Sequence, residues 1–179
     1  MVFIAFVHGL ILVVAGAFQG LIGLVFPGTR EVFVESGALL ALAGGLLVIV
    51  THDRPMRLTQ RMAFLLTASV WITAAAAGAL PLWLWGLTAT DAFFEAMSGI
   101  TTTGSTVMTG LDGTPQGITL WRGLTQWFGG VGFIVAGIAL LPVLRVGGMQ
   151  LYRTESSERG EKAMGSAARF AAATIWVYL

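Results

Sequence analysis

The sequence predicts an all-α membrane protein in which apolar helices cross a bilayer and one shorter helix enters it without crossing. Three observations predict this class. The 179 residues are 56% hydrophobic and only 11% charged, whereas about 25% of the residues of a soluble domain are charged. Apolar stretches long enough to span a membrane alternate with short polar ones. One apolar stretch, 91–100, is about half that length and is followed by a polar segment.

The composition also excludes several classes of protein. There is no cysteine, so disulfides and thiolate metal sites are excluded. A formal net charge of +1 and the lack of a dense basic patch argue against a nucleic-acid partner. No polar catalytic cluster is present, so an enzyme is not expected. The two histidines, His8 and His52, lie far apart in the sequence and are interpreted as helix-face or loop residues.

The first predicted span, Phe3–Phe26, contains no charged residue, and the first charge of the chain is Arg30. At about 1.5 Å per residue this span is long enough to cross the membrane. A cleaved signal peptide is the alternative, because Ala15–Ala17 resembles a cleavage site. No basic segment precedes it and the apolar run continues well past it, so we expect a retained helix. Its glycines suit close helix packing: Gly9, Gly16, Gly20 and Gly23.

A short polar turn is expected between the first and second spans. Pro27 and Gly28 end the first span. The turn contains three charged residues, Arg30, Glu31 and Glu35. The second span then covers about Val34–Thr51.

A basic loop, 52–61, leads to the third predicted span, Met62–Trp85. This span is expected to end at Gly78–Pro81. Trp83 and Trp85 follow, and they suit the aromatic belt that membrane proteins place at the interface.

The stretch Asp91–Thr106, with the sequence DAFFEAMSGITTTGST, carries the main functional signal. Thr90 or Asp91 can cap a helix, and Asp91 and Glu95 lie near the positive end of its dipole. The helix is expected to break at 98–99, after which threonines and a glycine follow. About ten helical residues reach only ~15 Å, roughly half the hydrocarbon thickness of a bilayer.

The polar end of this stretch would put bare backbone at membrane depth, which is tolerated only where protein covers it or where it lines a watery cavity. We therefore predict a re-entrant pore loop whose carbonyl oxygens replace the water shell of a cation. Gly104 permits the unusual dihedrals that such a loop needs. The threonine hydroxyls can add ligands, and the C-terminal end of the helix dipole favours a cation. One loop forms one side of a ring, so a closed pore needs about four of them.

Two other interpretations of this stretch stay open. It can be a Thr- and Ser-rich loop at a helix C-terminus that binds no ion. Gly99 and Gly104, followed by Ser105 and Thr106, also have the spacing of a phosphate-binding loop. The lysine that should contact phosphate is missing, however, and an apolar helix rather than a strand precedes the segment.

The rest of the chain completes one membrane–loop–membrane unit. Residues 107–119 are polar and turn-rich, 118–144 is the fourth span, and 145–169 is a hydrophilic loop of mixed charge. The last apolar run, 171–179, is too short to cross a membrane, so the chain is expected to be truncated at the start of another helix. Four units are expected. Residues 1–61 form an N-terminal two-helix hairpin with its loop, and 62–145 form one membrane–loop–membrane repeat. Residues 146–169 form a cytoplasmic loop, and 170–179 start the next helix.

The positions of the basic residues favour this topology. Of ten Lys and Arg residues, three lie in 52–61, five lie in 145–169, and only Arg30 and Arg122 lie elsewhere. The positive-inside rule places both basic loops, and with them the N-terminus, in the cytoplasm. That arrangement requires 91–106 to enter the membrane and to return to the same side.

Four motifs occur in order along the chain: GALP at 78–81, DAFFEAMSGITTTGST at 91–106, LTQWFGGVGFIV at 124–135 and LPVLRVGGMQLYRTE at 141–155. Together they resemble the TrkH family of potassium uptake proteins, part of the TrkH/TrkG/KtrB/HKT superfamily of potassium transporters. The resemblance covers most of the chain, more weakly before residue 60. It implies four membrane–pore–membrane repeats of potassium-channel-like architecture around one axis, preceded by two additional transmembrane helices that fit the first two spans.

The resemblance also implies roles for individual segments. Met62–Trp85 would be the outer helix of the first repeat, 91–100 its pore helix and 118–144 its inner helix. The selectivity filter would be 101–105, in which backbone carbonyls bind potassium. Its residues would be Thr102, Thr103 and Gly104, flanked by Thr101 and Ser105. Repeats two to four are absent from the chain, so the family's gating elements, which lie in a later repeat, have no counterpart to assign.

The function implied by the resemblance is potassium transport across the cell inner membrane, as a channel or as a symporter, with no organic cofactor. The implied partners are the remaining three pore repeats, from the same gene or a partner chain, a second copy in a homodimer, and a cytosolic nucleotide-binding regulatory subunit. The loop 145–169 is either near that subunit or simply solvated. A different class stays open: a non-transporting membrane assembly module, such as a truncated product that pairs with a partner chain.

Several other residues have two interpretations each. Asp112 can attract cations at the outer mouth or simply form an Asp-Gly turn. Snorkelling toward the interface is a sufficient explanation of Arg122. Glu95 is an ionisable residue at membrane depth and hence a functional candidate, or else a partner of the helix dipole or of hydrogen bonds. The glycines of 129–132 bend the inner helix, admit the filter segment closely or serve ordinary small-residue packing.

Overall fold

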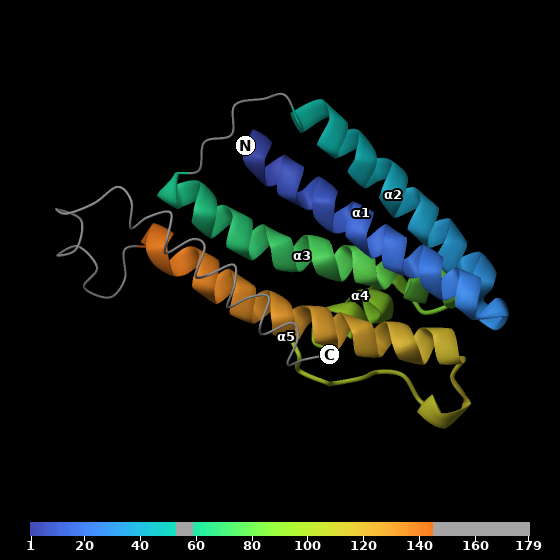
Figure 1. Ribbon diagram of the computed structural model, residues 1–179. Coiled ribbons are helices and arrows are strands. Elements are labelled where there is room, and N and C mark those ends of the chain that lie inside the picture. The colour runs from blue at the N-terminus through green and yellow to red at the C-terminus, as the bar shows by residue number, and fades with distance from the viewer. Residues whose placement is uncertain (53–58, 145–179) are drawn as a thin grey trace, which may run out of the picture.

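The computed structural model describes residues 1–52 and 59–144, which form a bundle of long helices with one short helix across it (Figure 1). No strand occurs in these two ranges, so the all-α prediction is confirmed. Three helical segments are long and apolar enough to cross a membrane: 2–25, 27–52 and 61–85. The helices are α1 (Val2–Val25), α2 (Arg30–His52), α3 (Gln60–Trp85), α4 (Ala89–Ile100) and α5 (Gln116–Leu144), with single turns at Pro27–Thr29 and Leu111–Gly113.

Part of the predicted organisation lies outside the described residues. This holds for most of the basic loop 52–61, for the loop 145–169, and for the apolar run 171–179.

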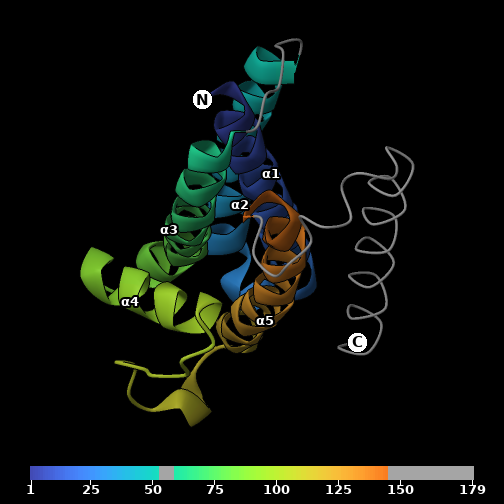
Figure 2. The same cartoon turned by 90° about the vertical axis from the view of Figure 1, so that its left-hand side faces the viewer.

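The four long helices alternate in direction. The end of α1, the start of α2, the end of α3 and the start of α5 lie at one end of the bundle (Figure 1). We call it the α4 end, because the chain runs from α3 into α4 there and returns to it at the start of α5 (Figure 1). The chain between α3 and α5 therefore leaves the bundle and returns to it at the same end. Figure 2 shows α4 lying crosswise to α3 and α5, and it contacts both.

Glycines bring α1 and α2 into close contact. A Cβ atom added to Gly16 would lie 2.6 Å from the carbonyl oxygen of Gly37, and one added to Gly44 would lie 2.6 Å from that of Gly9. The two backbones touch because these positions carry no side chain, as the spacing of the α1 glycines predicts. Small residues drive helix association in lipid in this way, since apolar burial adds little there.

Helix α3 continues through Pro81 to Trp85, although the sequence predicted an end at 78–81. Proline has no N–H group, so the carbonyl of Ala77 lacks its helical partner. Gln19 of α1 donates its Nε2 hydrogen to that oxygen at 3.0 Å, and the indole Nε1 of Trp121 of α5 donates to the next carbonyl, that of Gly78, at 2.9 Å. Because Gln19 satisfies the one carbonyl that the proline leaves open, the proline does not end α3.

Helix α2 also differs from the prediction. It starts at Arg30, directly after the turn 27–29, and not at Val34. The polar turn predicted around Arg30 is therefore the first part of the helix, where Glu31 lies in the first turn and complements the helix dipole.

A buried apolar cluster joins the helices at the α4 end. Phe33 of α2 and Trp121 of α5 meet edge to face there, with ring centroids 6.2 Å apart. The cluster positions α4, because two alanines of that helix belong to it. Its members are Ile22, Phe33, Ala79, Leu82, Ala92, Ala96, Ile118 and Trp121.

The contact between α1 and α2 can be tested with two neighbouring glycines of α2. Changing Gly44 to alanine should lower the free energy of unfolding by about 1–3 kcal/mol, the usual cost of overpacking, because the new methyl meets the backbone of α1. Gly45→Ala is the matched control, since no atom lies within 4 Å of its added Cβ. Thermal unfolding of the purified chain in detergent measures both. Equal stability of the two variants would contradict the close contact.

Candidate functional site

Helix α4 starts earlier than predicted, and it ends at Ile100, the end that the family resemblance implies. Its N-cap is Thr88, not Thr90 or Asp91: the Thr88 Oγ1 accepts the backbone N–H of Asp91 at 3.1 Å and donates to its carboxylate at 2.7 Å. The predicted break at 98–99 is wrong, since the helix continues to Ile100. Its 12 residues still reach only about 18 Å.

The C-terminus of α4 is closed by a Schellman motif. Thr103 donates its N–H to the carbonyl of Ser98 at 2.9 Å, and Thr102 donates to that of Gly99 at 2.9 Å. This motif requires a left-handed residue at Thr102, whose φ is +55°. Among the described residues Thr102 is the only non-glycine residue with a positive φ. A β-branched side chain rarely adopts such a dihedral, so the residue type at this position did not indicate it.

The backbone amides of 101–104 all bond back to α4. In addition to the two bonds of the Schellman motif, Thr101 donates to the carbonyl of Met97 at 2.9 Å and Gly104 donates to that of Ser98 at 3.4 Å. The carbonyl oxygens of the same four residues accept no hydrogen bond from any described residue. Gly104 has a φ of +76°, as predicted from its freedom. This segment therefore offers oxygen acceptors and no free amide donors.

The threonine hydroxyls of this segment hold the backbone in place. The hydroxyl of Thr101 donates to the carbonyl of Met97 at 2.8 Å, and the Thr103 hydroxyl lies 2.8 Å from that of Thr101. Of the two roles predicted for them, ligand or support, these contacts correspond to support. The side chains of 101–105 are all exposed on this chain.

The segment that follows returns along α4 and is fixed to it by two side chains. Ser98 donates its hydroxyl to the carbonyl of Ser105 at 2.6 Å. Oε1 of Glu95 accepts three hydrogens, from the Thr106 hydroxyl at 2.5 Å and from the backbone amides of Val107 and Met108 at 2.6 and 3.3 Å. Glu95 and Ser98 are three residues apart and thus share one face of the helix.

Glu95 is buried and also pairs with Arg122 of α5. The Nε and Nη2 atoms of Arg122 lie 3.0 and 2.9 Å from Oε2 of Glu95. Snorkelling is therefore the wrong explanation for Arg122. Of the two interpretations of Glu95, its contacts are those of hydrogen bonding and ion pairing. The pairing could have been anticipated from one signal: both residues are charges in apolar stretches, and such residues generally pair with each other.

Two glycines bring the end of α4 against α5. A Cβ on Gly129 would overlap the carbonyl oxygen of Ile100, and one on Gly99 would overlap the Thr125 hydroxyl. Gly129 therefore admits the end of the short helix closely, whereas the predicted close contact was with the filter segment that follows it. Gly132 makes no such contact, because nothing lies within 4 Å of its added Cβ.

The other candidate residues lie apart from this site. Asp112 is exposed in the turn Leu111–Gly113. His8 lies on the face of α1 that meets Ser69, whose hydroxyl is 3.0 Å from its Nε2. Within 1–52 and 59–144 no group of three His, Cys, Asp or Glu side chains could hold a metal ion.

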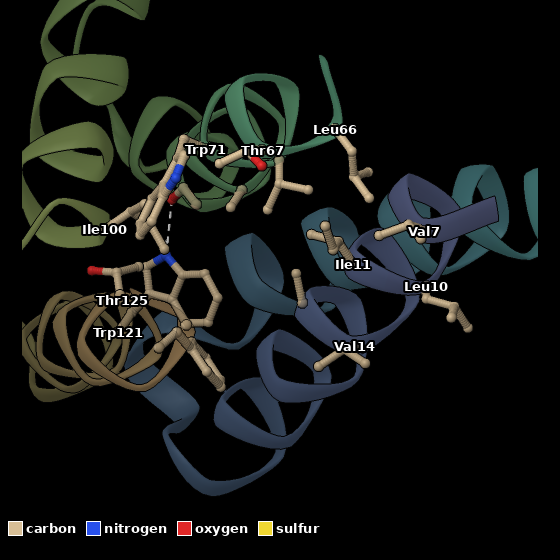
Figure 3. A pocket seen from close by; sticks show the side chains of 17 residues that line it. Val7, Leu10, Ile11, Val14, Leu66, Thr67, Trp71, Ile100, Trp121 and Thr125 are labelled. Carbon is tan, nitrogen blue, oxygen red and sulfur yellow. Dashed lines mark hydrogen bonds between the residues drawn. The ribbon is translucent and has the colours of Figure 1, made fainter. Parts of the chain in front are cut away.

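A cavity of about 540 Å³ lies between α1, α3 and α5, beside the end of α4 (Figure 3). Its walls are almost entirely apolar, with Trp71 of α3 and Val14 of α1 among them. Ile100 and Thr125 border it, but it offers an ion very few polar atoms. The 101–105 segment is not part of its lining.

Comparison with known proteins gives consistent matches. A family model named TrkH and described as a cation transport protein matches residues 29–179. The chain is 44% identical over 148 residues to the Trk system potassium uptake protein TrkI of Halomonas elongata, covering 82% of this chain and 30% of that protein. It is 41% identical over 140 residues to the Trk system potassium uptake protein TrkH of Escherichia coli K12, covering 76% of this chain and 29% of that protein.

A solved structure has the same fold. The crystal structure of the potassium transporter TrkH from Vibrio parahaemolyticus superposes with a TM-score of 0.75 at 31% sequence identity. The match covers 99% of this chain and 36% of that one. The chain thus spans about a third of the length of the proteins it matches.

The left-handed residue at the end of α4 can be tested by two glycine substitutions. Thr102→Gly should raise the free energy of unfolding by about 1 kcal/mol, because glycine adopts this dihedral without the Cβ clash. Thr103→Gly should lower it by about 0.5–1 kcal/mol, since that residue has a negative φ and glycine adds flexibility. Denaturation of the purified chain in detergent measures both. Shifts of the same sign would contradict the Schellman motif.

Proposed function

The chain belongs to the TrkH family of cation transport proteins, and on that basis we propose that it contributes one quarter of the selectivity filter of a potassium transporter. Members of this family are transporters and not enzymes. The proposed ligands are backbone carbonyl oxygens of Thr102, Thr103 and Gly104, flanked by Thr101 and Ser105. The chain covers about 30% of its relatives, so potassium as the substrate is part of the proposal.

One observation carries this function: the amides of 101–104 are used by α4 while their carbonyl oxygens are left without donors among the described residues. A dehydrated cation needs such oxygens. A phosphate-binding loop needs the reverse, namely free N–H groups directed at the anion. The hydrogen-bond pattern therefore favours a cation over phosphate.

The short helix supports a re-entrant topology. A length of about 18 Å is well short of the ~30 Å hydrocarbon core, and the chain leaves α3 and enters α5 at the same end of the bundle (Figure 1).

We propose that this α4 end of the bundle faces the outside of the cell. The N-terminus and the basic loops 52–61 and 145–169 are then cytoplasmic, in accordance with the positive-inside rule. The membrane is proposed to be the cell inner membrane.

A single loop cannot enclose an ion, which is why partners belong to the proposal. Three further pore repeats must complete the ring, from the same polypeptide or from another chain. The exposed 101–105 segment would face them. A second copy in a homodimer and a cytosolic nucleotide-binding subunit are further proposed partners. The proposed units of the chain remain 1–61, 62–145, 146–169 and 170–179.

Gly104→Val tests the filter. The assay protein is this chain in continuous reading frame with three further pore repeats, supplied by its own gene or by the corresponding part of the Vibrio parahaemolyticus transporter. Valine at a φ of +76° adds strain of roughly 1–3 kcal/mol and should displace the carbonyls. Potassium uptake by cells that lack their own uptake systems should fall about tenfold or more, and the preference for potassium over sodium should weaken.

Gly110→Val is the matched control. Gly110 has nearly the same dihedral, with a φ of +69°, and like Gly104 it has no atom within 4 Å of an added Cβ. It lies outside the proposed ligands, so the ion preference should stay that of the parent. Unchanged uptake and unchanged preference in Gly104→Val would contradict the filter assignment.

A further inference from the structure

One carboxylate joins three elements next to the candidate filter. Glu95 belongs to α4, its Oε1 accepts three hydrogens from 106–108, and its Oε2 is paired with Arg122 of α5. The residue is 3% exposed. Removing this group would leave the amide of Val107 without an acceptor among the described residues, and it would leave the Arg122 guanidinium without its carboxylate.

These bonds define where the filter segment ends. Thr101 to Gly104 are held on one side by the amides that close α4. On the other side the chain is held by Ser98, through the carbonyl of Ser105, and by Glu95. Four residues whose carbonyl oxygens accept no bond from the described residues are thus fixed at both ends to the same short helix. A shift of 106–108 relative to α4 would be passed directly to these oxygens, because few residues lie between.

Arg122 supplies the opposite charge that the buried Glu95 carboxylate needs while it holds residues 106–108. An unpaired buried carboxylate is strongly destabilised, and it would be expected to take up a proton. Two donors from Arg122 on Oε2 supply the opposite charge and leave Oε1 to the three donors of 106–108. The pair also has no net charge. An unpaired carboxylate could bind cations by itself without discriminating among them.

We propose that Glu95 and Arg122 are a positioning pair, which sets the ion preference of the filter by fixing residues 106–108 between α4 and α5. The proposal rests on the filter function proposed above. Neither residue is a ligand of the ion. Their effect reaches it through the backbone that they hold.

The experiment compares the assay protein with Glu95→Gln, Arg122→Gln and the double variant. In either single variant one charge of the buried pair loses its partner, and the preference for potassium over sodium should fall about tenfold, the scale of one lost hydrogen bond to a charged group. In the double variant the α4 glutamine can still accept from the amides and donate to the α5 glutamine, so the preference should return to within about threefold of the parent. Uptake of each ion is normalised to the amount of protein in the membrane. A purely structural role of the pair would change that amount and leave the ion preference as it is in the parent.

Asp91→Asn is the matched control, because Asp91 is an acidic residue one helical turn before Glu95 whose side chain bonds to Thr88 and not to 106–108. It should keep the preference of the parent.

If a single variant fails to reach the membrane, the other single variant and the double variant still test the proposal. A parent-like preference in an inserted single variant, or a lost preference in an inserted double variant, would overturn the proposal. If Gly104→Val also keeps the ion preference of the parent, the assignment of the filter is wrong. If Gly104→Val loses the preference, only the positioning role of Glu95 and Arg122 is wrong.

Discussion

The hydrogen bonds of four backbone amides determine the conformation on which the rest of the site depends. Thr101 to Gly104 turn their N–H groups back to the last carbonyls of α4, and their own oxygens are left without donors from the described part of the chain. In a bilayer such oxygens are costly unless water, protein or an ion satisfies them. The local end of one short helix thus leaves four acceptors open, and the surrounding helices hold that end in place.

Side chains from distant parts of the chain meet this requirement. Glu95 and Ser98 hold the returning segment, and Arg122 holds Glu95. Trp121, one residue earlier on α5, bonds to the backbone of α3. Ser98 and Glu95 satisfy backbone groups outside regular secondary structure, and Arg122 neutralises the Glu95 carboxylate. Most contacts in the bundle are apolar, whereas these few polar bonds fix the positions of α4 and of the segment that follows it.

The long helices could be predicted because the lengths of apolar runs are set by the thickness of a bilayer. The short helix was predicted for the same reason, and the dihedral of Gly104 followed from its residue type. The start of α2, the passage of α3 through Pro81 and the cap at Thr88 were missed. The cap is a local signal, because Thr88 bonds to Asp91 three residues later, whereas the passage through Pro81 depends on Gln19, 58 residues away. The pairing of Glu95 with Arg122 was also missed, because 27 residues separate the two. The ion-binding roles stay predictions.

The bond from Gln19 to the carbonyl of Ala77 has a consequence for the first two helices. A shortened version that starts after α2 would leave this oxygen facing hydrocarbon, at a cost of several kcal/mol. The first two helices therefore stabilise α3 through this bond. A relative without it would have to replace Pro81 by a residue with an N–H group, or provide another donor from elsewhere.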